Sequence, residues 1–286
     1  GKQIIVSAGG SGAYPNGFPL TNNATSAATN GSYVVIKPGT HTLKIRYWVK
    51  DIATNVEGTI TKILSSATYD QNKYYNITAN LNVKDYDSDH YYMWDAQDSY
   101  WAGYSSSQPK LINQSSGDYP KSGDSRYFHV GGGSGRFDAT NTSFNNIPNA
   151  NEMSWYCMYG DPHWDEDELW STMGHLYKGG MWFKKKSVLQ VENHYDTEKS
   201  ADGSTDLRIT SKSYTNSIIN SDIPSPTVVS NYFYLPCLGR YFSGQRNSIK
   251  DGYYWSSSAH PVSSASAYYL GFYKTQIRVY STHRYD

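Results

Sequence analysis

The sequence predicts a β-rich protein of two domains, an N-terminal β-sandwich over residues 1–84 and a C-terminal α+β domain over residues 85–286. Three observations lead to this prediction. Short runs near the N-terminus alternate apolar and polar residues, which is the pattern of strands with one buried face. A polar, aspartate-rich link then spans residues 85–90. Two segments with helix signals and a series of aromatic strands follow this link.

Five strands are expected in the N-terminal domain, over residues 2–7, 32–37, 42–50, 56–64 and 73–81. The strand at 42–50 has the clearest pattern, because apolar residues occupy every second position from Leu43 to Val49. Short strands joined by tight turns are typical of a β-sandwich. Five strands are few for a closed sandwich, so an open sheet edge or a missing strand is expected.

Two helices are predicted in the C-terminal domain. Asn149 is a suitable N-cap for the first, Glu152 stands at the capping-box position, and Gly160 ends it. The second helix is expected to begin at Asp165, because acidic residues favour the first turn of a helix, and to end at Gly174.

The last third of the chain indicates binding rather than catalysis. Its strands, at residues 253–258, 267–273 and 277–280, are rich in Tyr and Trp, which suit a half-buried pleated surface. The chain contains no Gly-x-Ser-x-Gly motif and no zinc-type cysteine spacing. The chain contains Asp and Glu residues, but no pattern identifies two of them as the catalytic carboxylates of a glycosidase. A glycan-active enzyme is therefore kept as an alternative.

Composition narrows the class of protein. The chain has 25 Lys and Arg residues and 25 Asp and Glu residues, so the formal net charge is zero. It therefore lacks the excess of positive charge that is typical of nucleic-acid-binding proteins. The 28 tyrosines and the low charged fraction are typical of an extracellular surface. No run of 18 apolar residues occurs, so the chain is not expected to span a membrane. We expect an extracellular protein whose export signal has been removed.

Aromatic residues are the preferred candidates for a ligand site. Sugar rings stack their C–H faces on Trp and Tyr, and their hydroxyl groups bond to small polar side chains. The predicted ligand-binding residues are Tyr253, Trp255, Ser257, His260, Tyr268 and Tyr273. The alternative is that the aromatic residues belong to the core and that the serines only form turns.

The acidic segment after Gly160 is a second candidate site. Ca²⁺ takes six to eight oxygen ligands, and Asp161, Asp165 and Asp167 could supply some of them. The alternative role for these carboxylates is helix capping. Cys157 and Cys237 could form one disulfide in an oxidising compartment, or remain two buried thiols.

Several separated motifs resemble one known family. They are NANEMSWY (149–156), GDPHWD (160–165), GHLYKGGMW (174–182), YFYLP (232–236), GRY (239–241) and YYWSSS (253–258). This order is similar to the major-paralogous-type C-terminal domain of surface proteins from gut Bacteroidetes. The resemblance covers residues 85–286 and implies a C-type-lectin-like fold.

Residues 1–84 resemble a fimbrillin-type pilin domain more weakly, through the KPGT turn at 37–40 and the YNITA segment at 75–79. Together the two resemblances imply a non-enzymatic adhesin or pilus-tip subunit on the bacterial cell surface. Such a protein would bind a glycan or a host surface protein, and other pilus subunits by strand addition. The alternatives are a structural pilus-associated subunit without a ligand and a secreted glycan-active enzyme.

Overall fold

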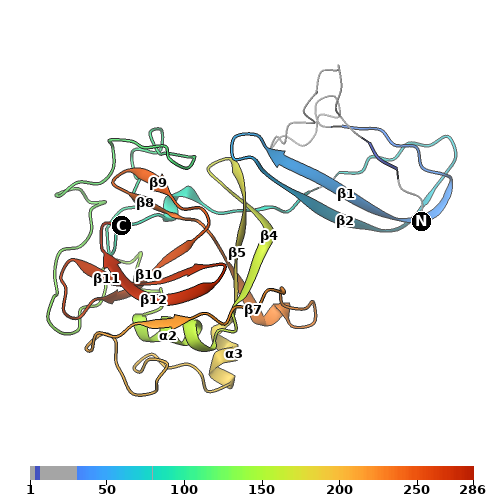
Figure 1. The fold of residues 1–286 in the computed structure, drawn as a ribbon. Helices are drawn as coiled ribbons and strands as arrows, with labels where there is room; N and C mark the ends of the chain where they lie inside the picture. Colours follow the sequence, from blue (N-terminus) through green and yellow to red (C-terminus); the bar gives the residue numbers. More distant parts are fainter. Residues whose placement is uncertain (1–3, 7–30, 79) are drawn as a thin grey trace. The chain divides into compact units, whose positions relative to one another are not determined.

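The computed structural model describes residues 4–6, 31–78 and 80–286. The chain is β-rich and contains several sheets, as the sequence predicts (Figure 1). Contacts divide it into two compact units, one of residues 1–49 and 59–82 and the other of residues 50–58 and 83–286. Within the described ranges, no helix has the length and apolar character needed to cross a membrane.

The first unit is built on a hairpin. Strand β1 (Gly39–Asp51) pairs with β2 (Val56–Tyr69) in a two-stranded sheet. The predicted alternation is confirmed, because every second residue from Leu43 to Val49 is buried or half-buried and the intervening residues are exposed. Two of the five expected strands, at 42–50 and 56–64, are therefore present in this sheet.

The remaining expected strands of this unit do not form in the described residues. Residues 32–37 and the described part of 73–81 have no strand pairing, so these two predictions are wrong. Of the expected strand at 2–7, residues 4–6 are unpaired and the others lie outside the described residues. A β-branched run becomes a strand only where its backbone finds a partner. Tyr33 and Val35 find none among the described residues and are almost fully exposed.

The second unit contains two four-stranded sheets. One has the order β10-β11-β12-β6 and is antiparallel throughout. Its three long strands confirm the predicted aromatic strands, and Lys274 and Thr275 form the turn between β11 and β12. The strands are β6 (Tyr214–Asn216), β10 (Gly252–Ala259), β11 (Ser266–Tyr273) and β12 (Gln276–His283).

The other sheet has the order β3-β4-β5-β7, with β3 parallel to β4 and the remaining pairs antiparallel. Its strands are β3 (Lys84–Asp85), β4 (His163–Thr172), β5 (His175–Lys184) and β7 (Tyr232–Pro236). Smaller elements complete the unit: β8 (Arg240–Phe242), β9 (Gln245–Asn247), α3 (Lys186–Val191), η1 (Ser88–His90) and η2 (Val229–Asn231).

Helix α2 (Ala150–Tyr159) is the first predicted helix, and its capping is confirmed. The Asn149 side chain accepts a hydrogen bond from the Glu152 backbone, and the Glu152 carboxylate accepts one from the Asn149 backbone. Met153 and Cys157 point into the main core, where they pack with residues of β5, β11 and β12. This packing fixes one face of the β10-β11-β12 sheet against α2.

The second predicted helix is wrong, because residues 165–174 belong to a β-hairpin. Met173 and Gly174 both have positive φ, which is the backbone of a tight two-residue hairpin turn. The turn joins β4 to β5. The stretch of β4 from Asp165 to Leu169 is longer than the stretch of β5 that it faces, from Lys178 to Gly180, so β4 bulges there. The acidic run that favours a helix start is thus the bulge of a strand.

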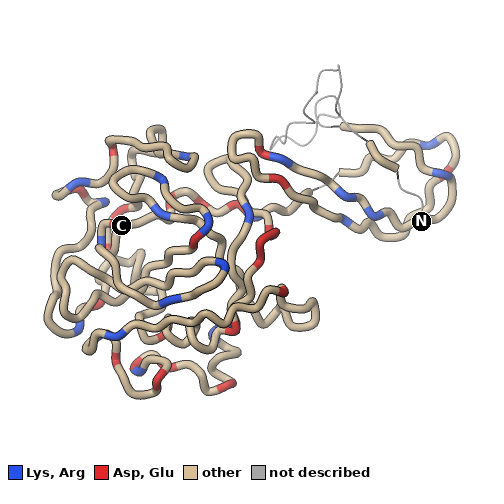
Figure 2. Tube along the Cα trace, viewed as in Figure 1, with Lys and Arg blue, Asp and Glu red and all other residues tan. Residues whose placement is uncertain are grey.

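Residues 91–147 form neither a helix nor a strand of the named sheets. Trp94 anchors this segment, because its indole donates a hydrogen bond to the Ser256 carbonyl oxygen over 2.8 Å. The Arg284 guanidinium lies over the Trp94 ring, and both side chains are fully buried. Figure 2 shows acidic and basic positions mixed along the chain, in keeping with its zero net charge.

Candidate functional site

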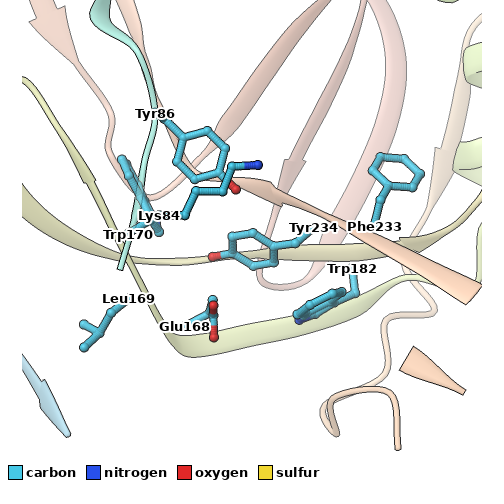
Figure 3. Close-up of a pocket in the computed structure, with 8 residues that line it drawn as sticks. All are labelled: Lys84, Tyr86, Glu168, Leu169, Trp170, Trp182, Phe233 and Tyr234. Carbon is cyan, nitrogen blue, oxygen red and sulfur yellow. The ribbon is translucent and has the colours of Figure 1, made fainter. Parts of the chain in front are cut away.

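A pocket of about 260 Å³ lies on the sheet that contains β4, β5 and β7. Figure 3 shows its lining residues, which are mainly aromatic. They belong to β3, β4, β5 and β7, apart from Tyr86, which directly follows β3. They are Lys84, Tyr86, Glu168, Leu169, Trp170, Trp182, Phe233 and Tyr234. The volume is near the lower end of small-molecule sites, so the pocket suits one ring of a ligand.

Strand register brings the walls of the pocket together. Trp182 of β5 is the direct cross-strand partner of Tyr234 on β7, and their rings lie 5.2 Å apart. On the other side, Lys84 of β3 pairs with Trp170 of β4. Tyr86 follows β3 and packs edge-on against Trp170 with ring centres 6.0 Å apart.

Gly180 makes room for the Tyr234 ring. A Cβ atom at this position would lie 2.5 Å from the Tyr234 hydroxyl and 2.4 Å from the Leu235 carbonyl oxygen. Both distances are far below van der Waals contact, so no larger residue fits without a shift of β7. The glycine therefore allows Tyr234 to lie across β5 and to form the floor between Trp182 and the β4 bulge.

Asp165 holds the bulge and one wall of the pocket at once. Its Oδ1 accepts hydrogen bonds from the backbone nitrogens of Asp167 and Glu168, over 3.1 and 2.9 Å. Its Oδ2 accepts one from the Trp182 indole over 3.0 Å. Because these bonds fix the backbone at Glu168 and the ring of Trp182, a buried carboxylate positions two lining residues.

The polar groups of the pocket are few and of different kinds. The Tyr234 hydroxyl is buried and has no hydrogen-bond partner among the described residues. Figure 3 shows it on the side of the pocket where Glu168 lies. A buried hydroxyl without a partner carries a free-energy cost that a ligand hydroxyl can remove. The Lys84 ammonium lies over the Tyr86 ring, 4.8 Å from its centre.

Burial and neighbouring charge alter the titration of these groups. Burial, with the nearby Asp165 carboxylate, raises the pKa of Glu168. Burial, with the Glu168 charge, raises the pKa of Tyr86 to about 12. Burial also raises the pKa of Tyr234. Both phenols are therefore neutral hydroxyl donors near pH 7, beside one acidic acceptor.

The pocket was not predicted from the sequence. Its residues come from segments that are distant along the chain, and only the strand order brings residues 84–86, 168–182 and 233–234 together. The dense Tyr and Trp content of these segments was the available signal, and it does not distinguish core from surface.

The predicted ligand residues lie on two faces of the β10-β11-β12 sheet. Tyr253, Trp255 and Tyr273 share the face opposite α2, because they alternate with residues of the α2 core. Trp255 is anchored by a hydrogen bond from its indole to the Tyr92 carbonyl oxygen over 2.9 Å. Ser257 lies in the irregular stretch of β10 between Trp255 and Ala259, and its backbone nitrogen donates a hydrogen bond to the Pro148 carbonyl oxygen.

The other two predicted ligand residues point elsewhere. Tyr268 is only 1 % exposed and belongs to the core beside α2. His260 packs against the Tyr268 ring, and its Nε2 lies 2.8 Å from the Ser211 hydroxyl oxygen. Burial lowers the pKa of His260. The six predicted residues are therefore not brought together in one site.

The three aspartates predicted for a metal do not converge either. Asp161 accepts a hydrogen bond from the Tyr232 hydroxyl over 2.6 Å and another from the Asn220 amide over 2.9 Å. Asp165 faces the bulge, and the Asp167 side chain is 91 % exposed. Within the described part of the chain, no three His, Cys, Asp or Glu residues form a metal-ligand group.

Cys157 and Cys237 are both free and fully buried, which corresponds to the thiol alternative and not to the possible disulfide. The Cys157 thiol lies 3.7 Å from the Ile277 carbonyl oxygen. Burial raises the pKa of Cys157 to about 12 and also raises that of Cys237. Neither side chain lies in the pocket.

Comparisons of the chain with protein families, with curated proteins and with solved structures give no match. The site is therefore interpreted from its own residues.

Proposed function

We propose that the protein is a non-enzymatic glycan-binding protein of the adhesin type, and that its pocket holds one sugar ring. The observation that carries the proposal is the buried Tyr234 hydroxyl, which is unpaired among the described residues and lies in a pocket with an aromatic wall. A sugar would place a C–H face on Trp182 and a hydroxyl against Tyr234. Glu168 and Lys84 supply an acceptor and a donor for further sugar hydroxyls.

The lining residues favour binding over hydrolysis. Glycoside hydrolysis generally uses two carboxyl groups on opposite sides of the scissile bond. Glu168 is the single carboxylate among the residues that line the pocket. The nearby Asp165 carboxylate is already engaged by two backbone nitrogens and the Trp182 indole.

The cellular setting of the proposal depends on the family resemblance. A C-type-lectin-like domain on a fimbrillin-like surface protein would place the pocket outside the cell, where a glycan or a host glycoprotein is the partner. The low charged fraction and the high tyrosine content agree with this setting.

A glycan-array screen of the full chain, with calcium and with EDTA, tests the proposal. For each glycan that binds, Trp182→Ala is expected to weaken binding by about ten- to a hundredfold, because the stacking wall is lost. Trp48→Ala is the matched control, since this tryptophan is 63 % exposed and lies on β1 of the first unit. If folded protein binds no glycan in either condition, or if Trp182→Ala binds like the control, the proposal fails.

A second candidate function is a structural pilus subunit. In the described residues, β1 and β2 form a sheet of only two strands, 13 and 14 residues long, so their outer edges have no partner strand. Long open edges can accept a strand from another subunit. Concentration-dependent assembly measured by light scattering would favour this function, and a constant monomer mass at all concentrations would count against it.

A further inference from the structure

The face of the β10-β11-β12 sheet opposite α2 carries an ordered stack of aromatic and guanidinium groups. The Arg240 guanidinium lies over the Tyr253 ring, 4.9 Å from its centre. The Tyr253 and Tyr269 rings are 5.8 Å apart. The Arg278 guanidinium lies 5.6 Å from the centre of the Tyr269 ring. The four side chains thus follow one another as Arg, Tyr, Tyr and Arg.

Gly271 makes this stack possible. It is the cross-strand neighbour of both Tyr253 and Arg278. A Cβ atom on Gly271 would lie 2.6 Å from the Tyr269 ring and 3.5 Å from the Arg278 Nε. The Tyr269 ring and the Arg278 guanidinium therefore both lie over the space that a side chain at 271 would fill.

The two arginines at the ends of the stack differ in whether a carboxylate pairs with them. Arg240 pairs with Asp286 over 3.3 Å, and the Tyr253 hydroxyl lies 3.4 Å from the Asp251 carboxylate. Arg278, in contrast, forms no ion pair with a carboxylate among the described residues, and its side chain is held by Tyr269 through stacking and a side-chain hydrogen bond. Stacking uses the flat face of a guanidinium and leaves its in-plane N–H groups available. Tyr269 therefore holds the Arg278 guanidinium in place, and no carboxylate among the described residues occupies its remaining N–H donors.

The surroundings of Arg278 are open and partly aromatic. Its cross-strand neighbours are Gly271 on one side and the exposed Thr215 on the other. Tyr280 lies two residues further along β12, on the same face, and is 51 % exposed. Gln276, two residues before Arg278, accepts a hydrogen bond from the Tyr273 hydroxyl over 3.1 Å. The strip from Gln276 to Tyr280 extends about 13 Å along the strand.

We propose that this strip on β12 binds an acidic polysaccharide, with the Arg278 fork on a carboxylate or sulfate group and Tyr280 against a sugar face. A guanidinium matches the two oxygens of such an anion in a bidentate arrangement. Because stacking on Tyr269 fixes the fork before the ligand arrives, little side-chain entropy is lost on binding. This site is separate from the pocket and does not depend on the function proposed for it.

Titration calorimetry of the full chain with trigalacturonate tests the carboxylate form of the ligand. Dextran sulfate tests the sulfate form, and neutral dextran is the uncharged comparison. We expect one or both acidic ligands to bind and neutral dextran to bind at least tenfold more weakly. Arg278→Gln should weaken acidic binding by about ten- to a hundredfold, as expected for a charge-assisted contact. Arg278→Lys should retain part of the affinity, because the charge remains and the fork is lost.

Arg136→Gln is the matched control. It removes the same charge from an arginine whose side chain is 48 % exposed and which pairs with Asp138 at the surface. Tyr280→Ala gives a second variant that should keep the fold, since this side chain is exposed. Equal affinity of folded Arg278→Gln and Arg136→Gln, or unchanged affinity of Tyr280→Ala, would overturn the proposal. Loss of acidic binding in Trp182→Ala with retention in Arg278→Gln would assign the anion to the pocket and overturn it as well.

Discussion

The Trp182 indole donates a hydrogen bond to Oδ2 of Asp165 over 3.0 Å. This bond explains why a carboxylate is buried in the middle of an aromatic sheet. The acidic run at 165–168 supports a strand bulge and orients a wall of the pocket. Neither a helix start nor a metal site is needed to account for Asp165.

Asp165→Ala is expected to lower the free energy of unfolding by about 1–3 kcal/mol, because three donors lose their common acceptor. Ligand binding in the pocket should weaken in parallel, since Trp182 is no longer held. Urea unfolding followed by tryptophan fluorescence measures the first effect. Asp167→Ala is the control, because its side chain is 91 % exposed and should change stability by less than about 0.5 kcal/mol. Equal effects of the two variants would contradict the positioning role of Asp165.

Tyr234→Phe should change stability and binding in opposite directions. Removing a buried hydroxyl that has no partner among the described residues should leave the free energy of unfolding unchanged or raise it by up to about 1 kcal/mol. The same change should weaken binding of a sugar by about tenfold, because one hydrogen bond to the ligand is lost. Thermal unfolding and titration calorimetry measure the two effects. A destabilised variant would show that the hydroxyl has a partner in the folded protein.

Acid should destabilise the second unit through Asp206. Burial opposes ionisation of this carboxyl group, but hydrogen bonds from Arg208 and Asn151 outweigh it and lower the pKa of Asp206 to about 2. Since the folded pKa lies below the unfolded value of 3.8, the stabilisation is fully present above about pH 4 and disappears as the pH falls toward 2. The lowered pKa corresponds to roughly 2 kcal/mol.

Asp206→Asn should therefore lose at least about 2 kcal/mol at pH 7, and its stability should vary less between pH 4 and pH 2. Urea titrations at several pH values provide the measurement. The control is Asp138→Asn, because the pair of Asp138 with Arg136 is exposed and contributes little. A wild-type-like pH profile for Asp206→Asn would be inconsistent with this assignment.

The two cysteines should resist thiol reagents in the folded protein. Both are fully buried, and burial raises the pKa of each thiol, so very little reactive thiolate is present at pH 8. We expect no reaction with a disulfide reagent before unfolding and reaction of both thiols after guanidinium is added. Protein purified without reductant that shows no reactive thiol in guanidinium would instead contain the bridge.

Local sequence patterns predicted the structure correctly where residues close along the chain determine the backbone conformation. The Asn149 and Glu152 capping box formed as predicted, because its partners lie three residues apart. The alternation from Leu43 to Val49 and the aromatic strands of β10, β11 and β12 also formed, because side-chain period and strand chemistry agree there.

The other elements depend on contacts between distant segments. Residues 165–172 became part of strand β4 because the Met173-Gly174 turn brings β4 against β5, and this pairing outweighs the local preference of an acidic run for a helix start. The strand-like run at 32–37 has no pairing partner in the described residues.

The same division applies to the candidate sites. The amino-acid sequence establishes that aromatic and small polar residues are plentiful, and the interpretation of a binding surface rather than a catalytic centre stays a prediction. Strand order alone brought Trp182 to Tyr234 and placed Glu168 and Lys84 beside them. Register likewise separated Tyr253 from Tyr268 onto opposite faces of one sheet. Contacts between distant segments depend on pairing energies that no local pattern encodes, so the sites could be recognised only in the folded chain.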